Sequence, residues 1–123
     1  MKELYREAMK ARINAQVPYS KLHVGAAIRC SDGSVYTGCN IENSSFGATI
    51  CAERTAAVKA ISEGHCDFEA IAICCDEGAA WPCGICRQFL YDFAPDMTVI
   101  TGNDENSLES YTLRELMPKG WEF

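Results

Sequence analysis

The chain has 123 residues, of which 48% are hydrophobic and 23% charged, and it carries a formal net charge of −6. This length and composition predict one globular domain over residues 1–123. Nucleic-acid binding depends on Lys and Arg side chains that neutralise phosphates, and the chain has no basic run, so we expect no polynucleotide partner. Charges occur throughout residues 1–16, so we expect neither a signal peptide nor a membrane partner, and we expect a cytoplasmic protein.

Strands and helices alternate along the chain, which is the pattern of a layered α/β sheet. After a first helix, two β-prone runs flank the turn sequence Ser-Asp-Gly and predict a hairpin. An Ala-rich helix then ends at Gly64, a residue type preferred just beyond helix C-termini. In chain order we expect a helix at 2–16, strands at 22–30 and 34–41, a polar loop at 43–49, a helix at 51–63, a strand at 68–75, a helix at 83–93, a strand at 97–101 and a short helix at 112–117.

The chain contains eight cysteines, which we expect to be reduced thiols rather than a disulfide framework. Buried free cysteine is common, and cytoplasmic proteins keep their thiols reduced. Five of the eight we attribute to packing or chance, namely Cys30, Cys39, Cys66, Cys74 and Cys75.

The sequence Pro-Cys-Gly-Ile-Cys ends at Cys86, and its Cys-x-x-Cys pair alone fits a redox dithiol and half of a metal site equally well. Cys51 opens another predicted helix and favours the metal site. Three thiolates at two helix N-termini suit a divalent cation, because the positive ends of helix dipoles lower thiol pKa values. Three protein ligands, Cys51, Cys83 and Cys86, leave the fourth tetrahedral position for water, as in a catalytic zinc site. Glu53 lies close enough to bond that water without ligating the metal.

A structural zinc site would need a fourth protein ligand, and none has suitable spacing. His23 and His65 both lie outside the motif, and His65 falls in a predicted loop beyond the helix. We interpret both histidines as structural or exposed.

The chain resembles the short-chain, homotetrameric cytidine deaminases over nearly its whole length. Zinc deaminases carry His-or-Cys-x-Glu followed by Pro-Cys-x-x-Cys, and this chain has the all-cysteine version. The resemblance implies a three-layer α/β/α sandwich around a five-stranded mixed sheet, and a homotetramer with shared active sites. The segments that carry it are PYSKLHVGAA, GCNIENSSF, ICAERTA, AISEG, PCGICRQ and LRELMP.

The resemblance also implies an activity, the hydrolytic deamination of free cytidine and deoxycytidine to uridines and ammonia in pyrimidine salvage. Cys51, Cys83 and Cys86 would hold one Zn²⁺ per chain, which lowers the pKa of a bound water toward neutrality. Glu53 would carry protons from that water to the pyrimidine ring and the leaving ammonia. Arg54 would offset the surplus negative charge of three thiolates, or alternatively lie on the surface of its helix.

Substrate-binding roles follow from the same resemblance. Asn40 and Glu42 of the segment NIEN correspond to ribose-binding residues, although Asn40 alternatively caps a turn at a strand end. Three positions depart from the family pattern. Leu22 stands where most relatives have a Phe near the pyrimidine, Phe46 where Tyr is frequent, and Trp121 roughly where a Phe reaches a neighbouring subunit's site. These departures leave the preference among cytosine analogues open.

Two alternative functions remain. Blasticidin S deaminases share the zinc motif and a Trp-containing tail, but they tend to lack the Glu of NIEN and the Arg after Cys-Ala-Glu. Glu42 and Arg54 are both present here, which favours cytidine. The more remote alternative is a non-catalytic zinc or thiol-redox module, which would release no ammonia from cytidine.

Overall fold

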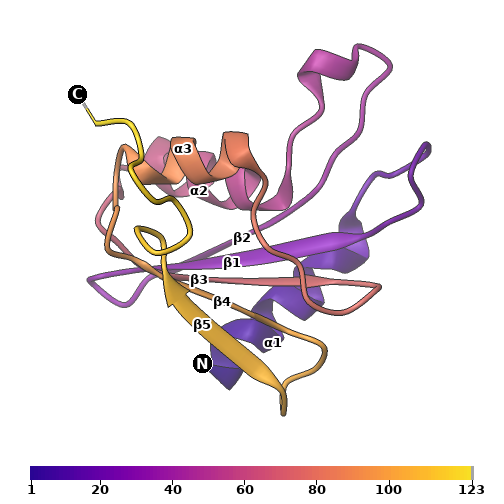
Figure 1. Cartoon of the computed structure of the whole chain (residues 1–123). Coiled ribbons are helices and arrows are strands. Elements are labelled where there is room, and N and C mark those ends of the chain that lie inside the picture. The colour runs from indigo at the N-terminus through magenta and orange to yellow at the C-terminus, as the bar shows by residue number, and fades with distance from the viewer. Residues whose placement is uncertain (123) are drawn as a thin grey trace.

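The computed structural model describes residues 1–122, and it shows a five-stranded mixed sheet with helices on both faces (Figure 1). The strand order is β2-β1-β3-β4-β5, and every neighbouring pair is antiparallel except β3 and β4. The elements are α1 (Lys2–Ala11), η1 (Arg12–Asn14), β1 (Val24–Cys30), β2 (Val35–Cys39), η2 (Phe46–Ala48), α2 (Ala52–Ser62), β3 (Phe68–Cys75), α3 (Gly84–Tyr91), β4 (Thr98–Gly102) and β5 (Leu108–Thr112).

The predicted fold class is confirmed, with α1 on one face of the sheet and α2 and α3 on the other. The single domain predicted for 1–123 includes Phe123, which lies outside the described residues, and these bounds stay a prediction. Among the described residues, every helix is too short or too polar to cross a membrane.

The packing of α1 depends on one close approach to the sheet. Tyr5 is buried, and its hydroxyl donates a hydrogen bond to the carbonyl of Gly102 at the end of β4, at 3.1 Å. A Cβ atom at Gly25 would overlap the carbonyl of Ala8 and lie 2.5 Å from the nitrogen of Arg12. Because Gly25 has no side chain, the end of α1 rests directly on β1.

On the other face, small side chains bring α2 close to the sheet. A Cβ atom at Gly38 in β2 would lie 2.6 Å from the carbonyl oxygen of Ala52. Close packing of α2 against β2 therefore requires glycine in the strand and small side chains on the facing side of the helix. That face consists of fully buried alanines, namely Ala52, Ala56, Ala57 and Ala60.

The direction of the strands determines where α2 and α3 begin. β2 and β3 are both antiparallel to β1, which lies between them, so they run in the same direction. α2 follows β2 and α3 follows β3, and both helices lie on the same face. Their N-termini consequently start from the same edge of the sheet and meet there.

The short helix predicted at 112–117 is wrong. β5 extends to Thr112, and residues 113–116 form turns. The amide nitrogen of Leu113 donates to the carbonyl of Met97 at 2.9 Å, and that of Arg114 donates to Pro95 at 2.8 Å. These bonds to the segment before β4 use backbone donors of the would-be helix, so tertiary contacts outweigh local helix propensity.

Two other elements differ from the prediction. The helix predicted at 2–16 ends as an α-helix at Ala11 and continues as the 3-10 turn η1, after which Ala15 is extended. β5 was not predicted from the residues, because its side chains are mostly exposed and give no apolar run. The remaining predicted strands and helices are present with boundaries shifted by a few residues.

Candidate active site

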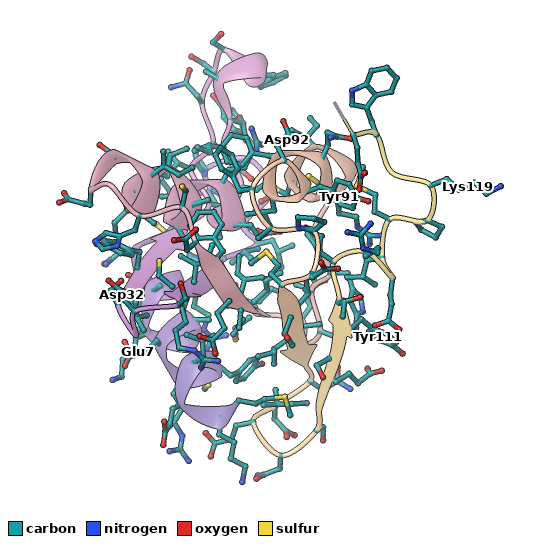
Figure 2. The ribbon with its side chains drawn as sticks, turned by 90° about the vertical axis from the view of Figure 1, so that its left-hand side faces the viewer. Glu7, Asp32, Tyr91, Asp92, Tyr111 and Lys119 are labelled. Carbon is teal, nitrogen blue, oxygen red and sulfur yellow. The ribbon has the colours of Figure 1, made fainter. Side chains whose placement is uncertain are left out.

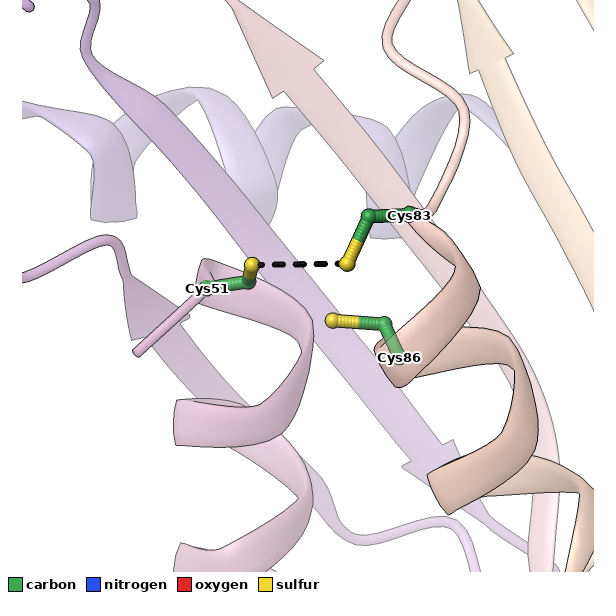
Figure 3. Close-up of side chains that lie close together, drawn as sticks. All are labelled: Cys51, Cys83 and Cys86. Carbon is green, nitrogen blue, oxygen red and sulfur yellow. Dashed lines mark hydrogen bonds between the residues drawn. The ribbon is translucent and has the colours of Figure 1, made fainter. Parts of the chain in front are cut away.

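Three cysteine side chains converge where α2 and α3 begin (Figure 3). Cys51 is the N-cap residue of α2, Cys83 is the N-cap residue of α3, and Cys86 lies in the first turn of α3. Their Sγ atoms all lie within 4.8 Å of one another, and those of Cys51 and Cys83 are 3.7 Å apart. The structure therefore brings together the three residues that the sequence predicted as metal ligands.

This donor set fits a tetrahedral zinc ion. Two sulfurs that each lie about 2.3 Å from one zinc ion at the tetrahedral angle are separated by about 3.8 Å. The 3.7 Å between Cys51 and Cys83 matches that separation. Within the cluster, Cys86 is fully buried, whereas Cys83 is exposed and lines a cavity. A fourth position facing this cavity is therefore accessible to a water or substrate.

Hydrogen bonds among the thiols and a guanidinium favour a thiolate at Cys51. The bond from Cys86 is the largest influence on the Cys51 thiol and, with contributions from Arg54 and Cys83, holds its pKa at about 5 against the opposing effect of burial. Donating that bond, together with burial, raises the pKa of Cys86. Nη2 of Arg54 lies 3.5 Å from the sulfur of Cys51, which raises the pKa of Arg54 in turn. A permanent positive charge thus lies against the thiol cluster.

Glu53 is a buried carboxylic acid in the first turn of α2. Its side chain is 4% exposed and lines the same cavity as Cys51 and Cys83. Burial raises the pKa of Glu53 to about 7, and the negative charge on Cys51 also raises it. A carboxyl group in this environment can both accept and donate a proton near neutral pH.

The cavity beside the thiols has a volume of about 230 Å³. Its walls include Trp81, Val24 and Ala80, which the sequence reasoning did not single out as site residues. The available signal was the position of Trp81, directly before the Pro-Cys motif. The complete lining is Leu22, Val24, Asn40, Cys51, Ala52, Glu53, Cys75, Ala80, Trp81 and Cys83.

Asn40 holds the wall of this cavity in place. Its Oδ1 accepts a hydrogen bond from the backbone nitrogen of Val24, and its Nδ2 donates to the carbonyl of Leu22, both at 2.9 Å. The side chain therefore fastens the start of β1 to the end of β2. This is close to the structural role that the sequence left open for Asn40, and the cavity-facing position also leaves it within reach of a ligand.

Glu42 lies two residues further along, outside the lining of the cavity. One carboxylate oxygen, Oε1, accepts hydrogen bonds from the backbone nitrogens of Tyr19 at 2.9 Å and Ser20 at 3.1 Å. Hydrogen bonding with Ser20 and Tyr19 lowers the pKa of Glu42, so the group is ionised at neutral pH. Both backbone bonds use the same oxygen, Oε1.

Phe46 and Trp121 do not line the thiol cavity of their own chain. Phe46 is 75% exposed on η2, in a loop that projects from the body of the molecule (Figure 1). Its ring packs edge-on against that of Tyr19, with the ring centroids 5.6 Å apart. Trp121 is 63% exposed and borders a separate hollow with Tyr91 and Arg114. The structure thus separates these two predicted site residues from the cysteines.

Comparison with known proteins agrees with this geometry. The family model "Cytidine and deoxycytidylate deaminase zinc-binding region" matches residues 1–102. The chain is 47% identical over 120 residues to a cytidine deaminase from Sporosarcina psychrophila, covering 96% of this chain and 88% of that protein. A crystal structure of cytidine deaminase from Burkholderia pseudomallei superposes with a TM-score of 0.90 at 37% identity, covering 97% of each chain.

The chain therefore belongs to the cytidine and deoxycytidylate deaminase zinc-binding family. The predicted family and the predicted cofactor, zinc, are both confirmed. A more distant relative is a blasticidin-S deaminase from Bacillus cereus, 36% identical over 108 residues that cover 80% of this chain and 76% of that protein.

We expect Cys51→Ala, Cys83→Ala and Cys86→Ala each to lose bound zinc, because two remaining thiolates hold the ion far more weakly than three. Zinc content of the purified variants, measured by elemental analysis, checks this. Cys39→Ala is the matched control, since Cys39 is a half-buried thiol at the end of β2 outside the cluster, and it should keep about one zinc per chain. Full zinc occupancy in Cys51→Ala would contradict the ligand assignment.

Proposed function

We propose that this protein is a hydrolase that converts free cytidine, and deoxycytidine, to the corresponding uridines with release of ammonia. The observation that carries the proposal is the thiol group of Cys51, Cys83 and Cys86 beside a small cavity that buried Glu53 and two of these thiols line, in a chain of this family. In the reaction, the carbon–nitrogen bond at carbon 4 breaks, a carbon–oxygen bond forms from water, and ammonia leaves.

The residues around the cavity divide the chemistry between them. Zinc held by Cys51, Cys83 and Cys86 would supply a water whose pKa lies near neutrality. The buried carboxylate of Glu53 would pass one proton of the water to the ring nitrogen, and then the second proton to the amino group as the carbon–nitrogen bond breaks. Arg54 stabilises the thiolate of Cys51 and so limits the negative charge that the substrate meets.

The apolar walls suit a single pyrimidine ring. Trp81 and Leu22 supply flat and branched apolar surface on the cavity wall, while Cys83 and Glu53 supply its reactive side. At about 230 Å³, the cavity accommodates a base-sized group rather than a stretch of polynucleotide. We assign the recognition of sugar hydroxyls to Asn40, which lines the cavity, and to Glu42, two residues further along the chain.

Blasticidin S is the less favoured substrate. Arg54 and Glu42, which blasticidin S deaminases tend to lack, both make specific contacts here, with the sulfur of Cys51 and with the backbone of residues 19–20. A substrate without a ribose would not use the carboxylate of Glu42 to bind sugar hydroxyls.

We further propose a homotetramer with active sites shared between neighbouring chains. The cavity of one chain is smaller than the roughly 300–1,000 Å³ of ordinary ligand pockets. Phe46, Trp121 and Ile85 are largely exposed. Nε of Arg54 is buried and has no hydrogen-bond partner among the residues that the structure describes. A neighbouring chain that closed the cavity would bury these exposed apolar side chains. It could also supply a hydrogen-bond acceptor to Nε of Arg54.

A cytoplasmic location is our proposal as well. All eight cysteines are free in the structure, and the three at the cavity are useful only as thiolates. Reducing compartments maintain that state.

Glu53→Gln should keep zinc but lose activity, because the amide cannot carry protons between water and substrate. Positioned proton transfer contributes about 10²–10⁴ in rate, and the loss in kcat should reach at least the upper part of that range, since several transfers use this group. Ammonia release from cytidine is the measurement. Glu63→Gln, at the exposed opposite end of α2, is the control with unchanged turnover. Near-normal kcat in Glu53→Gln would exclude the mechanism.

Glu42→Gln should lower kcat/KM for cytidine by about ten-fold, because a charge-assisted hydrogen bond to the sugar becomes a neutral one. The amide oxygen of Gln can still accept from Tyr19 and Ser20, so the loop is retained. The slow reaction of free cytosine is the internal control and should be unaffected. Equal losses with both substrates would mean that Glu42 only maintains the loop.

Shared sites predict complementation between two inactive variants. Phe46→Ala should be impaired because it removes a contribution to a neighbour's site, and Glu53→Gln because it removes the proton carrier. Co-expressed chains would form some sites with an intact Glu53 from one chain and an intact Phe46 from another. Activity of the mixed assemblies should exceed the sum of the two separate variants. An active monomer in light scattering, or no gain on mixing, would exclude shared sites.

A further inference from the structure

A second group of side chains of the types that ligate metals lies at the other end of α2. The sulfur of Cys30, a carboxylate oxygen of Asp32 and a ring nitrogen of His65 all lie within 4.8 Å of one another. α2 has 11 residues, so its length separates this group from the thiols at Cys51 by about 16 Å. Asp32 lies at the margin of the molecule in Figure 2.

These donors come from the end of β1, the turn that follows it and the residues just after α2. Cys30 is the last residue of β1, and its backbone closes the hairpin turn through a 2.9 Å bond with Ser34. His65 directly follows Gly64, whose positive φ of 92° ends α2, and the amide of His65 donates to the carbonyl of Ala60 at 2.9 Å. The group therefore depends on the folded arrangement of a strand end and a helix end.

Asp32 is oriented by the turn and keeps one oxygen for a ligand. Its Oδ1 accepts from the backbone nitrogen of Ser34 at 2.9 Å and from the hydroxyl of the same residue at 2.6 Å. The other oxygen, Oδ2, lies 3.3 Å from Nδ1 of His65. The His65 ring also packs against Tyr36 of β2, with centroids 5.6 Å apart. Carboxylate and imidazole thus face each other with their rotations restrained.

We propose that Cys30, Asp32 and His65 form a second binding site, separate from the active site, for a divalent transition-metal cation such as zinc or cobalt(II). One sulfur, one nitrogen and one oxygen are donors that zinc accepts, at three of its four tetrahedral positions. Calcium and magnesium prefer oxygen ligands alone and do not suit the set.

The space around the group is large enough for an ion and a water. A cavity of about 120 Å³ lies there, against about 30 Å³ for one water in the liquid. Cys66 lines the same cavity, so a thiol or a water can complete the coordination. The C-terminal end of a helix carries a partial negative charge, which favours a cation at this end of α2.

The second site is weaker than the three-thiol cluster. Burial raises the pKa of the Cys30 thiol, and the nearby Asp32, Asp67 and Cys66 raise it further, while a hydrogen bond from Ser34 opposes them. A cation must displace the Cys30 proton into solvent in order to bind. The site at Cys51 has three sulfur donors and the second site has one, so the first equivalent of zinc goes to Cys51 and its partners.

Calorimetric titration of the zinc-loaded protein with further zinc tests the proposal. The wild-type chain should take up one additional equivalent. His65→Asn and Asp32→Asn should each weaken this second binding by at least about ten-fold, the lower bound for losing even an outer partner of a metal site. Asn at position 32 keeps the oxygen that bonds Ser34, so the turn is preserved. Cobalt(II) added to the zinc-loaded protein should give a thiolate charge-transfer band that is lost in Cys30→Ala.

The other histidine provides the matched control. Nδ1 of His23 lies 2.8 Å from Asp76, a similar pair, but within the described residues it belongs to no group of three metal-binding donors. His23→Asn should keep the second equivalent. The proposal is overturned if the wild-type chain takes up no second equivalent, if His65→Asn binds it as tightly as wild type, or if His23→Asn loses it equally. The side chain of His65 is partly exposed, so we expect His65→Asn to fold. The test therefore remains valid even if Cys30→Ala, a change at a buried residue, is unstable. Metal binding is the readout, so the result does not depend on deaminase activity.

Discussion

The meeting of two helix N-termini at one edge of the sheet is the constraint on which the active site depends. β2 and β3 run in the same direction on either side of β1, so the helices that follow them must start from the same edge. Two positive helix ends facing each other repel, and negative charge between them is stabilised. The thiolate favoured at Cys51 provides such charge, and Cys83 and Cys86 would add to it on giving up their protons to a bound metal ion. Topology and electrostatics therefore favour the same place for anionic metal ligands.

The precision of this meeting depends on packing at some distance from the thiols. Gly38 and the alanine face of α2 set how closely that helix approaches the sheet, and so where Cys51 lies. Arg87 fixes the start of α3 in a comparable way. Its Nε donates to the carbonyl of Pro82 at 2.7 Å, and its Nη1 donates to that of Leu116 at 2.6 Å. The turns after β5 thus hold the loop that carries Cys83, although they contain no residue of the site.

The sequence predicted the parts of the molecule that are determined locally. Cys51 and Cys83 open predicted helices, and both are the N-cap residues of the helices observed, α2 and α3. Their convergence follows from strand order. The turns at 113–116 could not be predicted in this way, because Leu113 and Arg114 bond to residues before β4 rather than within their own segment. The wall formed by Trp81 was missed for a similar reason. A cavity is created by the packing of separate elements and leaves little pattern in any one of them.

The two ends of α2 carry opposite partial charges, and the residues at each end follow that difference. Three thiolates around Zn²⁺ leave a formal charge of −1 at the N-terminal end, and Arg54 lies against Cys51 to offset it. At the C-terminal end, one thiolate and one carboxylate around a divalent cation, with a neutral His65, would form a complex without net charge. Such a complex requires no compensating Arg, and the negative helix end stabilises the cation during its approach. The same helix can therefore support two metal sites with different ligands, provided that each ligand set balances the charge at its own end.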